Sequence, residues 1–101
     1  MTFRKKVLKY VSQIPKGKVT SYGFIAALAG KIRGSREVGW ILSSISADSN
    51  IPWWRVINSK GFISIKNVNI SKEIQKELLE KEGITVSDDF MVDLNKYLWR
   101  P

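Results

Sequence analysis

Apolar side chains recur at helical spacing in the first part of the chain. Phe3, Val7, Val11 and Ile14 are three or four residues apart, which places them on one face of a helix. Thr2 is a suitable N-terminal cap for this helix, and the proline that follows Ile14 ends it. The pattern therefore predicts an amphipathic helix at the start of the sequence.

Two shorter apolar stretches follow, separated by a glycine and a basic linker. Ser21 precedes the stretch Tyr22–Ala29, which Gly30 closes. Ser35 is the predicted cap of a further helix that runs from Arg36 to about residue 45 and carries its own apolar stripe. Two helices joined by a glycine-bounded turn form the helix-turn-helix pattern. Many small helical domains share this pattern without binding DNA, so it identifies no function alone.

The second half of the chain predicts a small β element and one more helix. Val56 and Ile57, and then the stretch 62–65, flank turn-forming residues at 58–61, which favours a hairpin or wing. A helix is expected from about Ser71 to Glu82, with Gly83 after its end and with these residues facing inward: Ile74, Leu78 and Leu79. Beyond it we expect irregular chain with apolar anchors that return to the core: Val92, Leu94, Tyr97, Leu98 and Trp99.

These elements predict a mainly α fold with a small β hairpin, arranged as a winged helix-turn-helix-like domain. The 101 residues are enough for one small domain, so we expect a single domain over residues 1–101. A hydrophobic content of 44% supports a packed core rather than a disordered chain.

The charge balance of the chain favours a polyanionic partner. Seventeen Lys and Arg residues against nine Asp and Glu residues give a net charge of +8. Nucleic acid is the simplest partner for such a surface, although charge alone does not separate it from an anionic membrane. The sequence has no apolar run near the roughly 18 residues that a membrane span needs. We therefore expect a protein of the cytoplasm, associated with the nucleoid, or of the nucleus in a eukaryote. We also expect it to be a monomer.

The absence of cysteine and histidine excludes several kinds of chemistry. Without either residue the chain can form no disulfide, no thiolate nucleophile and no Cys/His zinc site. It also has no imidazole to act as a general base. Serine, lysine or carboxylate chemistry stays open, but no motif for it is present, so we expect no catalytic residue, no metal and no cofactor.

The most unusual stretch of the sequence is Ile51–Ile57, which reads Ile-Pro-Trp-Trp-Arg-Val-Ile. Pro52 fixes its own backbone and biases the residue before it toward an extended conformation. Adjacent residues of a strand or tight turn cannot face the same way, so Trp53 and Trp54 cannot share one environment. At least one indole should line a cleft, meet a partner or pack against a different part of the fold.

This stretch resembles the Pro-Cys-His-Arg-Val active-site motif of the O6-alkylguanine-DNA alkyltransferases, with Trp53 at the cysteine and Trp54 at the histidine. A tryptophan at the cysteine marks the alkyltransferase-like proteins, which cannot take up the alkyl group but usually keep the histidine. The resemblance extends along nearly the whole chain, through these segments: Ile14–Val19, Ser21–Ala26, Ser35–Gly39, Glu80–Gly83 and Val92–Pro101.

The resemblance implies a DNA interface on the predicted helix pair. The family binds the minor groove of duplex DNA and rotates a damaged guanine out of the stack. Tyr22 matches the tyrosine that crowds the phosphate beside the target, and Arg36 matches the arginine that fills the vacated position. Ser35 and Gly39 belong to the matching recognition helix. Trp40 falls where the family usually has a small residue, and it either faces the core or inserts as an apolar wedge.

The resemblance also implies a pocket for the extruded base. Trp53 should form its wall, at the point nearest the O6 substituent, and backbone groups of residues 56–59 should read the base edge. Lys66 lies where alkyltransferase-like proteins have an arginine that contacts the flipped base. The expected pocket residues are therefore Tyr22, Pro52, Trp53, Val56, Ile57, Ser59 and Lys66.

Three further residues have implied supporting roles. Arg55 should brace the motif rather than contact DNA. In the enzymes, Glu82 belongs to a hydrogen-bond chain that polarises the cysteine through the histidine. With both of those positions occupied by tryptophan, Glu82 should be a structural residue at a helix end. Trp54 departs even from the non-catalytic relatives and should pack behind the motif.

The sequence thus leads to a hypothesis of non-enzymatic damage recognition. The protein would bind double-stranded DNA containing O6-alkylguanine and flag the lesion for another pathway, with nucleotide excision repair proteins as expected partners. The alternative is a winged helix-turn-helix regulator that reads undamaged DNA. That alternative shares the charge and the helix pair, but it gives no reason for Trp53 and Trp54. An enzyme of another type would lack a recognisable pair of nucleophile and base.

Overall fold

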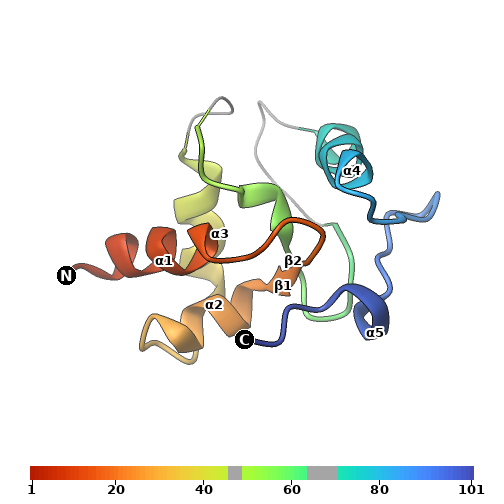
Figure 1. Ribbon diagram of the computed structural model, residues 1–101. Helices are drawn as coiled ribbons and strands as arrows, with labels where there is room; N and C mark the ends of the chain where they lie inside the picture. The colour runs from red at the N-terminus through yellow and green to blue at the C-terminus, as the bar shows by residue number, and fades with distance from the viewer. Residues whose placement is uncertain (46–48, 64–70) are drawn as a thin grey trace.

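In the computed structural model, which describes residues 1–45, 49–63 and 71–101, helices surround a short pair of strands (Figure 1). No helix within these ranges is long and apolar enough to cross a membrane. The elements in chain order are α1 (Phe3–Ser12), β1 (Thr20–Ser21), α2 (Tyr22–Leu28), α3 (Ser35–Ser43), the 3₁₀ turn η1 (Trp53–Arg55), β2 (Val56–Ile57), α4 (Lys72–Lys81) and α5 (Leu94–Tyr97).

Side-chain caps fix the starts of three helices where the sequence predicts them. The hydroxyl of Thr2 accepts a hydrogen bond from the Lys5 amide, and the hydroxyl of Ser21 accepts one from the Phe24 amide. Ser71 caps α4 in the same way. Each cap satisfies an amide of the first turn that has no partner within its own helix.

The predicted cap of α3 is wrong by one residue. Ser35 is the first helical residue, and Gly34 occupies the cap position without a side-chain bond. Gly34 is buried, and a Cβ there would lie 3.0 Å from the Lys31 carbonyl oxygen and 3.1 Å from the Phe3 ring. The chain packs closely at this glycine, so the turn closes there and the helix begins directly after it.

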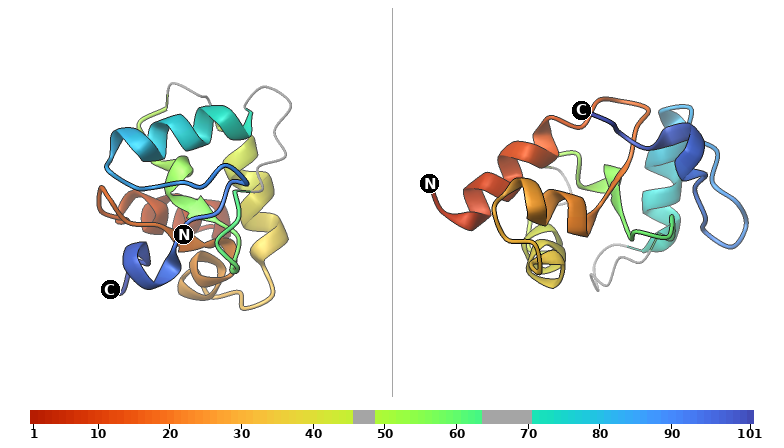
Figure 2. Two further views of the ribbon diagram at one scale, coloured as in Figure 1. Left: turned by 90° about the vertical axis from the view of Figure 1, so that its right-hand side faces the viewer. Right: turned by 90° about the horizontal axis from the view of Figure 1, so that it is seen from below.

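Two clusters of buried side chains form the core. The first lies among α1, α2, α3 and the stretch Ile51–Ile57, called the Trp motif below, and its members are Val7, Val11, Ile14, Ile25, Ala26, Ala29, Val38, Leu42, Trp53 and Val56. The second lies between the strands, α4 and the last part of the chain, and its members are Val19, Ile57, Ile63, Leu79, Ile84, Val86, Val92 and Tyr97. Trp54 packs against both clusters. Figures 1 and 2 show the strands between the two groups of helices.

The mainly helical fold is confirmed, but the strand pair within the described residues is parallel and is not the predicted hairpin. The predicted turn does form, because the Gly61 amide bonds to the Asn58 carbonyl and the Asn58 amide bonds to the Phe62 carbonyl. However, β2 pairs in parallel with β1, and Phe62 bridges to Met91 instead. Both side chains of β2 are buried, so this strand belongs inside the molecule and not on an exposed wing. Ser64 and Ile65 of the predicted hairpin lie outside the described residues.

The inward face of α4 differs from the prediction at one turn. Ile74 is 44% exposed, whereas Gln75 is buried. The side-chain amide of Gln75 donates hydrogen bonds to the backbone carbonyls of Trp54 and Val56, at 3.0 and 3.1 Å. These bonds turn Gln75 toward β2 and leave Ile74 outside. Leu79 faces inward as expected.

The last part of the chain returns to the core as predicted, but it is not wholly irregular, because Leu94–Tyr97 form the short helix α5 with Asp93 as its cap. Val92 and Tyr97 are buried, and Leu94, Leu98 and Trp99 are half-buried. The Val19 amide bonds to the Tyr97 carbonyl at 2.9 Å, and the Trp99 amide bonds to the Val19 carbonyl at 2.8 Å. This segment therefore lies beside the chain that leads into β1.

We predict that Gly61→Ala destabilises the fold more than Gly30→Ala. Both glycines have φ of +93°, a conformation that costs a residue with a side chain about 1–2 kcal/mol. A Cβ at Gly30 meets nothing within 4 Å, but one at Gly61 would lie 2.6 Å from the Val92 carbonyl oxygen. Denaturant unfolding should show an additional loss of about 1–3 kcal/mol for Gly61→Ala. Equal losses in the two variants would show that the backbone at Val92 yields freely.

Candidate nucleic-acid interface

A single 3₁₀ turn sends the two central indoles into different surroundings. The turn forms because the Arg55 amide bonds back to the Pro52 carbonyl at 3.1 Å. The rings of Trp53 and Trp54 meet edge to face, with centroids 5.8 Å apart. Trp53 is 3% exposed within the first cluster, while Trp54 is half-buried. The indole N–H of Trp53 finds no acceptor among the described residues, so this buried side chain carries an unpaired donor.

The Glu82 carboxylate, at the end of α4, holds the Trp motif in place. It accepts hydrogen bonds from the Trp54 indole at 2.8 Å, from Arg55 at 2.7–3.1 Å and from the Gly17 amide at 3.1 Å. Arg55 also donates to the Ile14 carbonyl at 2.8 Å. These contacts show the expected brace at Arg55 and give Glu82 a structural role.

This network determines the charge state of Glu82. Burial alone would raise the pKa of its carboxyl group, but the hydrogen bonds from Arg55, Trp54 and Gly17 and the charge of Arg55 outweigh burial. The pKa of Glu82 is therefore lowered from its ordinary value of 4.5, and the side chain stays anionic near neutral pH.

The outer face of α3 presents a cation and a large apolar ring. Arg36 is exposed in the first turn, and Trp40, four residues on, is 73% exposed. Residues four apart lie on the same face of a helix, so the two side chains are neighbours. The sequence left two alternatives for Trp40, the core or an apolar wedge, and the exposure of its ring shows that it does not face the core. Gly39 lies beside it, and a Cβ at Gly39 would meet nothing within 4 Å. Ser35 is exposed where the helix begins.

Tyr22 begins α2 directly after β1 and is half-buried against the first cluster. Burial raises the pKa of its phenol, so the side chain remains neutral at physiological pH. Parallel pairing of Ser21 with Ile57 makes Tyr22 and Asn58 leave the strands at the same end. The topology thus brings the predicted backbone-contacting tyrosine beside the turn that was predicted to read the base.

The structure separates the predicted pocket residues by burial. Pro52, Trp53, Val56 and Ile57 are buried, whereas Ser59 is exposed. Lys66 lies outside the described residues. Pro52 and Trp53 lie just before β2, whereas Val56 and Ile57 form it. Ser59 lines an open cavity, and none of these four buried residues does.

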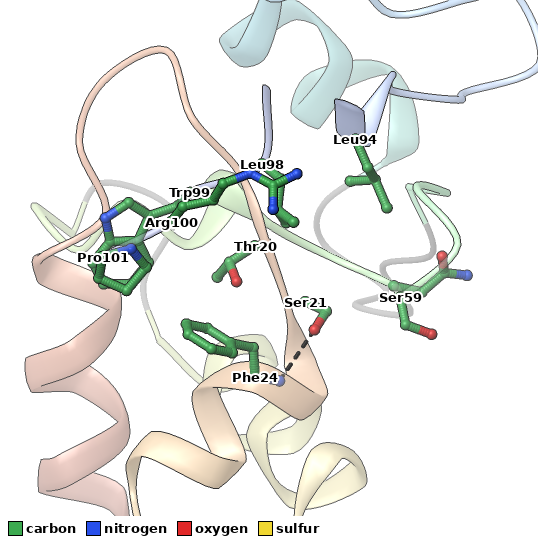
Figure 3. Close-up of a pocket in the computed structure, with 10 residues that line it drawn as sticks. Thr20, Ser21, Phe24, Ser59, Leu94, Leu98, Trp99, Arg100 and Pro101 are labelled. Carbon is green, nitrogen blue, oxygen red and sulfur yellow. Dashed lines mark hydrogen bonds between the residues drawn. The ribbon is translucent and has the colours of Figure 1, made fainter. Parts of the chain in front are cut away.

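That cavity has a volume of about 380 Å³ and lies between the strand ends and the last residues of the sequence (Figure 3). Its lining residues are Thr20, Ser21, Phe24, Asn58, Ser59, Leu94, Leu98, Trp99, Arg100 and Pro101. Sequence reasoning assigned the apolar residues near the end of the chain to the core and missed that they line a cavity. The Trp99 ring, which meets Phe24 edge to face at 6.2 Å, explains how this segment is held against α2.

Comparison with known proteins identifies the family. Residues 2–84 match the family model described as 6-O-methylguanine DNA methyltransferase, DNA binding domain, and the chain belongs to this family. It is 44% identical to a DNA base-flipping protein of Vibrio parahaemolyticus over 98% of this chain and 97% of the relative. It is 36% identical to Alkyltransferase-like protein 1 of Schizosaccharomyces pombe over 98% of this chain and 95% of that protein.

Two solved structures also align with most of this chain. The crystal structure of S. pombe Atl1 in complex with damaged DNA containing O6-carboxymethylguanine aligns with a TM-score of 0.92 at 36% identity. The alignment covers 98% of this chain and 95% of that one. A Mycobacterium tuberculosis OGT structure in complex with DNA aligns with a TM-score of 0.71 at 29% identity, and it covers 82% of this chain and 49% of that one.

We predict that Glu82→Gln lowers the free energy of unfolding by about 2–4 kcal/mol at neutral pH. Removing one partner of a buried ion pair leaves the other uncompensated, and the side chains of Arg55 and Glu82 are only 15% and 8% exposed. Because the folded-state pKa of Glu82 is lowered, its contribution is complete above its ordinary pKa. That contribution is lost as the pH falls from about 4.5 through the folded-state pKa.

The control is Glu80→Gln, because Glu80 is exposed on the same helix. Denaturant unfolding from pH 7 to pH 3 should show the Glu82→Gln deficit shrinking in acid, while Glu80→Gln follows the wild type. A deficit of constant size across this range would mean that the carboxylate charge contributes nothing.

Proposed function

We propose that the protein recognises O6-alkylguanine in duplex DNA without chemically repairing it. It binds the minor groove, extrudes the damaged base into a Trp-lined pocket and flags it for another pathway, with nucleotide excision repair as the proposed recipient. One observation carries the proposal: a chain of the methyltransferase DNA-binding family contains no cysteine. It therefore has no thiol that could accept an alkyl group.

The names of the relatives support DNA binding with base extrusion. Relatives at 44% and 39% identity are named DNA base-flipping proteins, and S. pombe Atl1 is solved in complex with damaged DNA. Extrusion brings a buried base to a protein pocket at the cost of its stacking and pairing, which is a few kcal/mol. A net charge of +8 supplies the attraction for the phosphate backbone.

The positions of Arg36 and Tyr22 suit the two tasks that extrusion requires. Arg36 is exposed at the start of α3, where its planar cation can fill the vacated space and hydrogen-bond the unpaired base. Tyr22 begins α2, at the end of the strands beside the Asn58–Ser59 turn, so it is placed to press on the backbone next to the target. Ser35, Gly39 and Trp40 complete the DNA-facing surface of α3 in this proposal.

The proposed pocket has Trp53 as its wall and the chain from Val56 to Ser59 as its reading edge. The unpaired indole N–H of Trp53 supports this role, because a buried donor without an acceptor is costly unless a ligand satisfies it. Since Trp53 is only 3% exposed, base entry has to uncover this ring. Lesion binding should therefore change the surroundings of Trp53.

The proposal predicts tight lesion binding with no transfer. Duplex carrying one radiolabelled O6-methyl group should bind at least ten-fold more tightly than the same duplex with guanine, because the damaged base is easier to extrude and fills the pocket. After denaturation, all label should remain with the DNA. Equal affinity for the two duplexes would contradict damage recognition, and label retained stably by the protein would contradict the non-enzymatic role.

Arg36→Ala should reduce the preference for damaged over undamaged duplex by about ten-fold, the scale of a lost stacking contact. A simple phosphate contact would instead weaken both duplexes equally and lower the salt slope by about 1. Arg36→Lys is the matched control, because it keeps the charge but loses the planar fork. Titrations at several salt concentrations should show a normal slope and a reduced preference for Arg36→Lys. If both variants keep the full preference for damaged duplex, Arg36 makes only an electrostatic contact.

A further inference from the structure

Trp40 is a large apolar side chain that the fold leaves unused. It is 73% exposed on α3, although tryptophan is among the side chains that gain most from burial. Its backbone carbonyl accepts a bond from the Ser43 hydroxyl, but its ring is absent from both core clusters. A ring held outside the core by a rigid helix is suited to contact a partner.

The surroundings of Trp40 indicate that this partner is DNA. Arg36 lies one turn earlier on the same face, and Arg33 is exposed in the turn before the helix. Lys31, in that same turn, is already paired with Glu37. The open space around Gly39 removes one obstacle to close approach of the helix. A basic, sterically open helix face with a single protruding ring matches a minor-groove surface better than a protein-binding groove.

Spacing places Trp40 close to the site of extrusion. Residues four apart on a helix have Cβ atoms about 5–6 Å apart, while successive base pairs are about 3.4 Å apart. If Arg36 fills the place of the extruded base, Trp40 meets the duplex one or two base pairs away. An apolar ring at that position can enter between base pairs from the minor groove.

We propose that Trp40 is a wedge that partly unstacks the base step beside the lesion and makes lesion recognition depend on the flanking sequence. This inference rests on the proposed function. Unstacking is least costly at flexible pyrimidine–purine steps and most costly in stiff A-tracts. A duplex whose flanking step deforms more easily should therefore bind more tightly. A chain with a small residue at this position would be nearly indifferent to the flank.

The test uses four duplexes, with guanine or O6-methylguanine beside either a TA step or an A-tract. The variants are Trp40→Ala, which removes the ring, and Trp40→Leu, which keeps an apolar wedge. Ile74→Ala is the control, because it shortens another apolar side chain that is 44% exposed but lies on α4 and not on α3. A 2-aminopurine placed in the flanking step reports unstacking by an increase in fluorescence. Each variant is exposed at the substituted residue, so all should fold.

We expect wild type to bind the TA-flanked duplexes about ten-fold more tightly than the A-tract duplexes, with an increase in 2-aminopurine fluorescence. Trp40→Ala should bring this ratio within two-fold and abolish the increase, while Trp40→Leu retains most of both and Ile74→Ala changes neither. An unchanged ratio in Trp40→Ala would overturn the wedge, and so would a wild-type ratio near one. If the wedge signals appear on both guanine and O6-methylguanine duplexes without lesion preference, the proposed function fails while the wedge stands.

Discussion

The fold depends on one carboxylate placed where three segments of chain meet. Glu82 ends α4, accepts from both Trp54 and Arg55 in the central motif, and accepts from the Gly17 amide in the loop that follows α1. Arg55 extends the same network to the Ile14 carbonyl. A carboxylate buried among so many donors is stabilised in its charged form, and the donors in turn are fixed in direction. The Trp motif is therefore held through Trp54 and Arg55, while Trp53 packs into the first core cluster.

The local elements of this fold could be predicted because their causes are local. The caps at Thr2, Ser21 and Ser71 depend on a side-chain oxygen and an amide three residues apart, which the sequence displays directly. The parallel pairing of Thr20 with Val56 depends on contacts between distant segments, and a turn at 58–61 pointed to a hairpin instead. Likewise, Gln75 displaces Ile74 from the core only because two backbone carbonyls of the Trp motif face it.

In the candidate site, too, some features could be predicted from the sequence and others depend on contacts between distant segments. Recognition of the Pro-Trp motif led to Arg36, Tyr22 and Trp53 as a group, and helical periodicity placed Arg36 on α3. Periodicity did not determine the direction of Trp40, because an apolar residue at the edge of a stripe is compatible with either face. The cavity beside Ser59 was not predicted, since its far wall comes from Leu98 and Trp99, which reach β1 through backbone bonds to Val19.

The position of Trp54 has a mechanical consequence. Its ring packs against both core clusters and its N–H donates to Glu82, so this one side chain links the two clusters. A protein with two loosely joined halves can close around a ligand like a clamp, using a hinge. Here the shared indole stiffens the place where such a hinge would lie. In the proposed function, the protein then moves mainly to uncover Trp53, and the bending and opening fall on the DNA.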